Sequence, residues 1–250
     1  METIKAQVRR GYSRSWVVQK YSVVGLWPSE DILCRAYWQP GMRVLDLGCG
    51  AGRTTIPLVR HGYRVIGVDL SLPMAHQAHR LARQQGVAGV WGVGDAMALP
   101  FADSSFEGLL FSYNGIELVP GIAGKKRVLE EAWRVLRPGG HLIFCAHALE
   151  ALNRYLFLRL RKLLRYGWGR LWRNPSQEME IGESVYDPNR NLEVYYLQIL
   201  SPRTYRRLLF QVGFKLVYDN SRQRIEAGKA PCGFADFDPD FKFYVAQKPF

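Results

Sequence analysis

The chain has 250 residues, of which 48% are hydrophobic and 22% are charged, a composition typical of a globular protein with a full core. Its apolar runs are too short for a membrane-spanning helix, and its N-terminus lacks a secretory signal, so we expect a cytoplasmic protein. The four cysteines are widely separated and follow no metal-ligand spacing, which predicts reduced thiols and no metal site.

The positive charge of the chain is concentrated in one segment. Thirty-four basic residues against 22 acidic ones give a net charge of +12. Residues 150–173 contain seven basic residues and one acid, and so supply half of that excess. A local excess of this kind predicts a basic surface patch rather than a uniformly basic protein.

Two helices are expected at the N-terminus, before the first strand. Residues 3–22 predict a helix rich in aromatic side chains, and the Gly-Leu-Trp-Pro run at 25–28 ends it. Ser29 is the expected N-cap of a second helix through about Trp38, with two acids in its first turn.

Residues 44–47 form an apolar run that contains Asp46 and ends in three glycines spaced by two, Gly48, Gly50 and Gly52. This pattern predicts a buried parallel strand that enters a tight turn beneath a ligand, followed by a helix over about 53–61. A second apolar run ends in Asp69, where an acid is well placed to accept two hydrogen bonds from a ribose diol.

The glycine pattern distinguishes two kinds of nucleotide site. A dinucleotide-binding loop requires a third glycine at the sixth position, which here is Arg53. The order of Asp46, Gly48, Gly50 and Gly52 instead resembles motif I of the class I S-adenosylmethionine (SAM)-dependent methyltransferases.

Three downstream segments strengthen this resemblance. The run GDAMALPFADSSFE at 94–107 is similar to the segment that joins strands three and four in that family, and strand four follows at 109–111. The run EEAWRVLRPGG at 130–140 is similar to the helix and turn before strand five, at 141–144. The four motifs follow in the family's order within residues 40–148.

The remaining elements complete an alternating α/β pattern. Ser71 is the expected cap of a helix to about Gln85, and a short third strand follows at 87–91. A helix over 201–211 and strands at 214–218 and 240–246 end the chain. The resemblance implies a Rossmann-like α/β fold, with a seven-stranded, mainly parallel sheet, an antiparallel last strand and helices on both faces.

We expect a single methyltransferase domain over residues 1–250. Its parts are an N-terminal helical cap at 1–39, a SAM-binding core at 40–148, an insert or lid at 149–200, and a C-terminal helix with the last strands at 201–250.

The carboxyl ends of the strands are expected to meet over one pocket. By the family resemblance, Gly48, Gly50 and Gly52 would let the methionyl part and the ribose approach the backbone. Asp46 would help to hold the SAM amino group, or alternatively would only cap the next helix. Asp69 would accept hydrogen bonds from the ribose hydroxyls.

The adenine end of the pocket is expected to involve three further residues, and the sulfonium end one. Leu70 would lie against the ring, Asp95 would accept from its amino group, and the Ala96 amide would donate to a ring nitrogen. Asp95 is alternatively a turn residue. Asn114, after strand four, is expected to line the floor under the sulfonium.

No catalytic residue is assigned, because methyl transfer requires a general base only when the nucleophile arrives protonated. The candidates for such a base are Tyr21, Glu117, His147 and Tyr186. His147 is alternatively a structural histidine, and Glu117 is alternatively solvated.

The sequence predicts SAM-dependent methyl transfer to an O, N or C atom of a small or medium-sized organic acceptor. The Asn/Asp-Pro-Pro-aromatic motif of amino-methylating nucleic-acid enzymes is missing, and Ser-Tyr-Asn-Gly stands at 112–115 instead. The alternatives are RNA or protein methylation through the basic surface, lipid or quinone methylation at a membrane surface, and a SAM-binding regulatory or scaffold subunit.

The basic segment at 150–173 interleaves leucines and tryptophans with its cations, as an amphipathic helix does. Three interpretations remain open. The helix is a lid over the acceptor pocket, a membrane-surface helix that contacts anionic lipid, or a contact site for an anionic partner such as RNA. The oligomeric state is not predicted.

Overall fold

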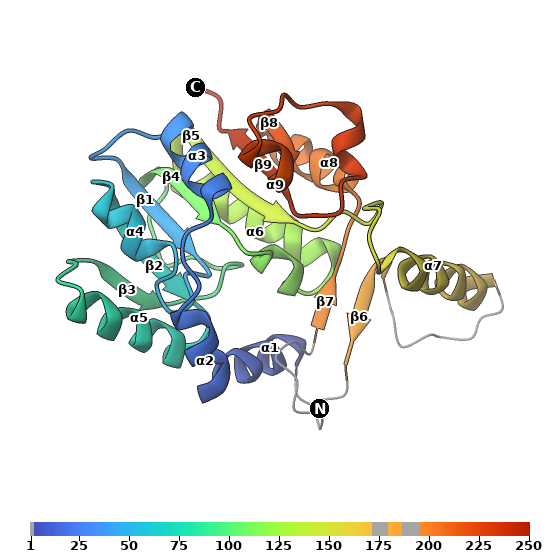
Figure 1. The fold of residues 1–250 in the computed structure, drawn as a ribbon, viewed down its shortest axis with the longest axis horizontal. Coiled ribbons are helices and arrows are strands. Elements are labelled where there is room, and N and C mark those ends of the chain that lie inside the picture. The colour runs from blue at the N-terminus through green and yellow to red at the C-terminus, as the bar shows by residue number, and fades with distance from the viewer. Residues whose placement is uncertain (1–2, 172–179, 187–195) are drawn as a thin grey trace.

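A seven-stranded sheet with the order β3-β2-β1-β4-β5-β9-β8 forms the centre of the computed structural model, which describes residues 3–171, 180–186 and 196–250 (Figure 1). Strands β1 to β5 are parallel, and β9 is antiparallel to both β5 and β8. The predicted Rossmann-like sheet is therefore confirmed. Its strands are β1 (Arg43–Leu47), β2 (Arg64–Asp69), β3 (Val90–Val93), β4 (Phe106–Phe111), β5 (Leu136–Ala146), β8 (Lys215–Ser221) and β9 (Lys242–Gln247).

Helices bury both faces of this sheet. Neighbouring residues of β1 point in opposite directions, so that Val44 joins one hydrophobic cluster and Leu45 the other. Burial on both faces explains why the strands are almost continuously apolar. The first face packs against α3 (Pro28–Tyr37), α4 (Thr55–Arg60) and α9 (Arg222–Glu226), and the second against α6 (Gly121–Val135) and α8 (Pro202–Val212), while α5 (Leu72–Gln84) packs along β2 and β3.

Two of the predicted helix caps are confirmed. The Ser71 hydroxyl accepts a hydrogen bond from the Met74 amide at the start of α5, and Ser201 does the same for Thr204 in α8. Gly213 ends α8 with φ of 103°, a conformation that favours glycine.

The single N-terminal helix predicted over 3–22 is wrong, because two helices, α1 (Ile4–Tyr12) and α2 (Ser15–Ser22), occupy this segment. The Ser13 hydroxyl bonds back to a carbonyl in the last turn of α1, and Arg14 is extended, with φ of −73° and ψ of 138°. The local hydrogen bond therefore competes with continuation of the helix.

The predicted N-cap at Ser29 is also wrong, since Trp27 is the N-cap of α3 and Pro28 is its first residue. Proline is preset for that position, and the Glu30 carboxylate accepts from the Trp27 amide at 2.7 Å. The third strand lies at 90–93 rather than 87–91, in a register that places Val93 beside Asp69.

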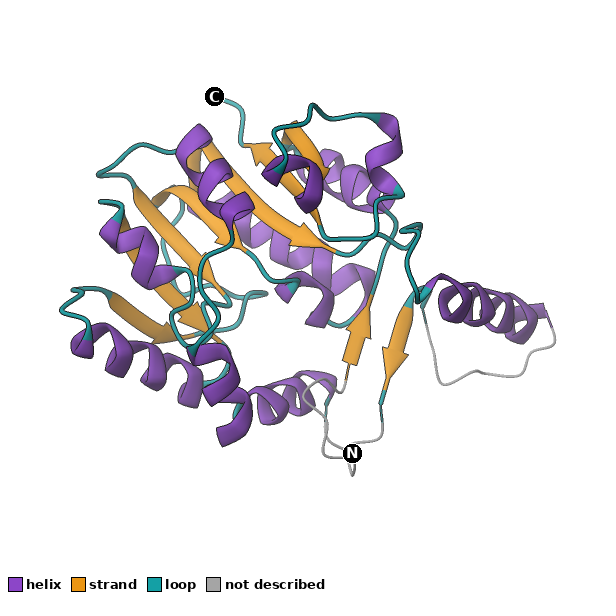
Figure 2. Ribbon diagram, viewed as in Figure 1, coloured by secondary structure: helices purple, strands orange, loops and turns teal. Residues whose placement is uncertain are grey.

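The insert after β5 contains α7 (Leu156–Leu171), within the segment expected to form an amphipathic helix. It also contains a two-stranded antiparallel ribbon of β6 (Glu183–Val185) and β7 (Tyr196–Gln198), and the sequence did not predict this ribbon. Two short 3-10 helices, η1 (Gly115–Leu118) and η2 (Gly233–Asp236), complete the elements. Figure 2 shows α7 beside the ribbon, on the side away from the large sheet. No helix among the described residues is both long enough and apolar enough to cross a membrane.

A buried lysine attaches this ribbon to the core. Lys125 in α6 is fully buried, and its ammonium donates to the Val119 carbonyl at 2.6 Å and to Gln198 Oε1 at 2.8 Å. The Tyr196 hydroxyl also accepts from the Gly121 amide at 2.9 Å. These bonds fix β7 against the N-terminal end of α6.

Lys125 makes stability depend on pH. Burial lowers its pKa to about 7, although nearby carboxylates favour the charged form, whereas an unfolded lysine titrates near 10.4. Between these values the unfolded chain binds more protons, so the stability of the native protein rises with pH, by at most about 1.4 kcal/mol per pH unit. We expect urea denaturation at pH 7 and pH 9 to show this gain relative to Lys125→Met. An identical pH dependence in the two proteins would contradict the assignment.

Candidate functional site

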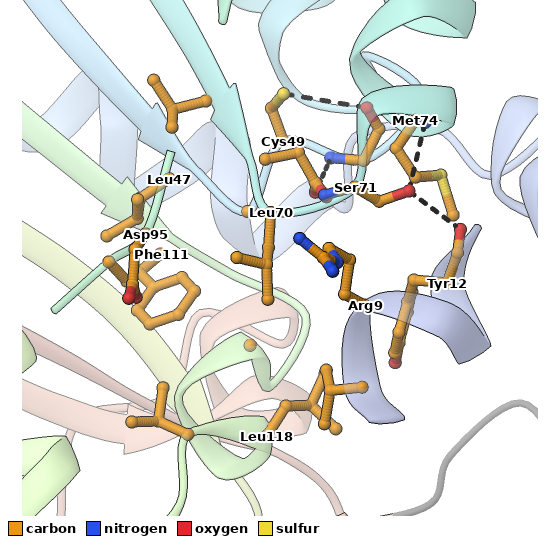
Figure 3. Close-up of a pocket in the computed structure, with 18 of the residues that line it drawn as sticks. Arg9, Tyr12, Leu47, Cys49, Leu70, Ser71, Met74, Asp95, Phe111 and Leu118 are labelled. Carbon is orange, nitrogen blue, oxygen red and sulfur yellow. Dashed lines mark hydrogen bonds between the residues drawn. The ribbon is translucent and has the colours of Figure 1, made fainter. Parts of the chain in front are cut away.

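A pocket lies where the carboxyl ends of β1, β2 and β4 meet, beneath the N-terminal helices (Figure 3). Its volume is about 140 Å³. Side chains of Leu70, Phe111, Leu118 and Arg9 point into the same space in the close-up. The walls come from α1, the glycine loop after β1, the end of β2, the loop from β3 to β4, and the segment from β4 to α6.

The glycine loop has the sharp bend that the sequence predicts. Gly48, Gly50 and Gly52 have φ of 67°, 55° and 87°, a region in which only glycine is unstrained. Gly48 and Gly50 line the pocket. Gly52 is not among the lining residues, and a Cβ there would lie 3.2 Å from the Ala78 Cβ in α5. The third glycine therefore permits close packing of the loop against α5.

Asp69 ties this loop to the end of β2. Its Oδ2 accepts from the Gly50 amide at 2.9 Å, and its Oδ1 accepts from the Ser71 amide at 2.8 Å. Burial raises the pKa of its carboxyl, while the backbone donors favour the charged form. Asp69 and the adjacent Leu70 both line the pocket, as predicted residues of the adenosyl site would.

Asp95 and Ala96 form the opposite wall. Asp95 Oδ1 accepts from the Met97 amide at 3.0 Å, which gives it the turn role left open in the sequence. Its Oδ2 also pairs with the Lys5 ammonium of α1 at 2.5 Å. Asp95 therefore lines the pocket and also orders the turn that follows it. Lys5 connects α1 to this carboxylate.

Besides Gly52, two predicted site residues, Asp46 and Asn114, lie outside the pocket lining. Asp46 is 1% exposed, and its Oδ2 accepts from the hydroxyls of Thr54 and Thr55 at 2.5 Å each, while burial raises its pKa to about 6. This geometry supports the alternative that Asp46 orders the start of α4. Asn114 has φ of 53° and begins η1, and its two neighbours line the pocket instead. A contact of either with SAM stays a prediction.

Arg53 is a pocket residue that the sequence did not assign. It is 8% exposed and forms a bidentate pair with Glu30 of α3, at 2.5 and 2.8 Å. Its guanidinium lies 5.3 Å from the Trp27 ring centre and 4.9 Å from that of Tyr113. The sequence does contain a sign of this role, since Arg53 stands where a dinucleotide-binding loop has its third glycine. A charged side chain that is buried at such a position needs a partner.

The helix α1 supplies further unpredicted lining residues. Lys5, Arg9 and Tyr12 all reach the pocket, and Tyr21 of α2 joins them. Of the four candidate bases, Tyr21 is therefore at this pocket. No group of three or more side chains able to hold a metal ion occurs in the part of the chain that the structure describes.

His147 and Tyr186 line a second pocket, on the other side of η1. Glu117 in η1 is fully buried, and its Oε2 lies 2.9 Å from His147 Nδ1. The imidazole also packs on the Phe241 ring, with centroids 4.2 Å apart. Glu117 is thus a buried partner of His147 and not a solvated acid.

A model of the family described as "Methyltransferase domain" matches residues 44–140, from β1 to the first part of β5. Its match includes the glycine loop and both pocket carboxylates, Asp69 and Asp95. Residues 44–140, which are less than half of the chain, are therefore similar to a methyltransferase domain.

Curated relatives to which the chain is similar include demethylmenaquinone methyltransferases. One from Mycobacterium sp. (strain KMS) is 35% identical over 150 residues, which are 58% of this chain and 60% of the relative. The ubiquinone/menaquinone biosynthesis C-methyltransferase UbiE of Ruegeria sp. (strain TM1040) is 34% identical over 110 residues, 42% of each chain. The chain thus aligns with less than two thirds of the length of these relatives.

Solved structures share the fold over nearly the whole chain. A SAM-dependent methyltransferase of Methanosarcina mazei superposes with a TM-score of 0.68 at 23% identity, covering 91% of this chain and 100% of its own. The [4+2]-cyclase SpnF gives 0.67 at 18% identity, covering 99% and 97%. A structure titled as a cyclase on the same fold means that the fold alone does not define the reaction.

The pKa of His147 tests the pair with Glu117. Burial opposes its charge, yet the Glu117 carboxylate raises this pKa above its ordinary value, with Asp240 adding to the rise and Arg159 opposing it. We expect Glu117→Gln to lower the pKa of His147, measured by NMR titration of the histidine Cε1–H resonances.

The same substitution has a consequence for stability. A histidine pKa that is raised in the native state stabilises the native protein, and this stabilisation is complete below about pH 6.5, the pKa of an unfolded histidine. It is lost as the pH rises through the pKa of His147 in the native protein. The advantage of the wild type over Glu117→Gln is therefore expected to shrink from pH 5.5 to pH 8. An unchanged His147 titration would refute the pair.

Proposed function

We propose that the protein is a SAM-dependent methyltransferase that acts on a small or medium-sized organic acceptor. The observation that carries this proposal is the convergence of Gly48, Gly50, Asp69 and Asp95 on one pocket at the carboxyl edge of a class I methyltransferase domain. Backbone without Cβ atoms and two acids at strand ends suit an adenosyl ligand.

The carboxylates retain capacity for a ligand. An ionised carboxylate has about four lone-pair sites, and Asp69 uses one on each oxygen for a backbone amide. Asp69 would hold the ribose hydroxyls and Asp95 the adenine amino group, with Leu70 against the ring. Because ligand pockets usually exceed about 300 Å³, the first pocket must widen to admit SAM.

SAM supplies, when bound, a methyl group on a positively charged sulfur. The chain's own contribution is alignment of the acceptor in a site from which water is excluded. Aromatic side chains around the pocket suit this role, since Tyr21 packs 5.7 Å from Tyr12 and 5.6 Å from Tyr113, measured between ring centres. Methyl transfer to an acceptor that is already nucleophilic needs no base from this wall.

An apolar acceptor at a membrane surface is supported by a second observation. Relatives are named demethylmenaquinone methyltransferases, and α7 exposes Phe157, Leu164 and Trp168 at 75%, 75% and 67% beside basic residues. Exposed aromatic and leucine side chains on a basic helix favour anionic lipid over RNA as a partner. Among the described residues, α7 contributes nothing to the first pocket, so a lid role would concern the second.

Asp69 provides the direct test of the SAM site. Replacement by Ala removes the acceptor of the ribose hydroxyls, and we expect SAM affinity to fall by about 2–4 kcal/mol, with a smaller loss for Asp69→Asn, which keeps one acceptor oxygen. Isothermal titration calorimetry measures both.

The matched control is Asp103→Ala, which removes an acid whose side chain is 77% exposed. It is expected to bind SAM as the wild type does. Unchanged affinity in a folded Asp69→Ala protein would overturn the assignment. SAM binding without release of S-adenosylhomocysteine in the presence of acceptors would instead favour the scaffold alternative.

A further inference from the structure

A second pocket of about 470 Å³ lies between α7, the β6–β7 ribbon and the end of β5. It shares no lining residue with the first pocket. Leu158 and Leu163 of α7 and Leu197 and Ile199 of the ribbon side provide apolar walls. The volume is within the usual range for a site that takes a small organic molecule.

Arg159 is the buried cation of this pocket. It is only 9% exposed, and one Nη donates to the Ala151 carbonyl. Its Nε is buried without a hydrogen-bond partner among the described residues, and Glu150 is the carboxylate whose charge acts on this guanidinium. A buried charged donor left unpaired is costly, so the site favours an anion that would accept from it.

The other polar groups around the pocket add to this preference. Lys162 contributes a second cation, and its ammonium donates to the Ser184 hydroxyl. His147 is paired with Glu117, and the Asp240 carboxylate lies 3.8 Å from the Arg222 guanidinium. Glu117 and Asp240 therefore have cationic neighbours of their own, and the Nε of Arg159 is the buried donor that remains for a ligand among the described residues.

We propose that this second pocket binds an amphiphilic organic anion, with its carboxylate, sulfonate or phosphate at Arg159 and its apolar body between α7 and the ribbon. The proposal does not depend on SAM binding.

Aromatic packing joins the walls of the second pocket to those of the first. The Phe241 ring packs on His147, at 4.2 Å, and on Tyr113, at 6.3 Å, and Tyr113 lines the first pocket. Glu117 holds His147 from η1, whose last residue, Leu118, also lines the first pocket. The anion is thus placed on the acceptor side of the proposed methyltransferase.

Two fluorescent probes of the same shape test the proposal. One is 8-anilinonaphthalene-1-sulfonate, and the other is N-phenyl-1-naphthylamine, which lacks the sulfonate. We expect Arg159→Met to lower the affinity for the sulfonate probe by about tenfold or more. The affinity for the neutral probe should stay within about twofold of that of the wild type.

Arg161→Met is the matched control, because it removes an exposed cation from the same helix, and it is expected to bind both probes as the wild type does. The proposal is overturned if Arg159→Met and Arg161→Met bind the sulfonate equally, or if S-adenosylhomocysteine displaces the probe from the wild type. Unchanged binding of the neutral probe verifies that the variants fold, and titration of each variant with S-adenosylhomocysteine reports separately on the first pocket.

Discussion

The bond from the Gly50 amide to the Asp69 carboxylate is the interaction on which the first pocket depends. The chain leaves β1 through residues of positive φ, and such a bend is stable only where side chains are absent and backbone donors find acceptors. Asp69 satisfies one donor, and the Val68 carbonyl accepts from the amides of Gly48 and Cys49 at 2.7 and 3.1 Å. The end of β2 therefore shapes the loop after β1.

Buried charged groups attach the peripheral elements to this edge. The Arg53–Glu30 pair joins the glycine loop to α3, and Lys125 joins α6 to the ribbon. Both groups lie beside residues that line the first pocket. Removing one partner of a buried ion pair typically costs about 3–5 kcal/mol, so the Arg53–Glu30 pair gives α3 a well-defined position beside the glycine loop.

The sheet and its edge were predictable because their signals are local. The apolar run before the three glycines and the one before Asp69 each indicate a strand that ends at a ligand site. Neither prediction needs knowledge of residues far away in the sequence. The second pocket was not predictable, since it requires Arg159 of α7 to meet a ribbon whose strands are three residues each. The break at Ser13 depends on one side-chain hydrogen bond. The sequence left two roles open for Asp46, and its threonine partners support the one at the start of α4.

Hydrogen exchange of the unsubstituted protein, with and without S-adenosylhomocysteine, tests the central claim most directly. Our account predicts that the ligand slows amide exchange in three separate segments, at 48–53, 69–71 and 94–97, which converge on the first pocket. Exchange that is unchanged in these segments at a saturating ligand concentration would contradict it.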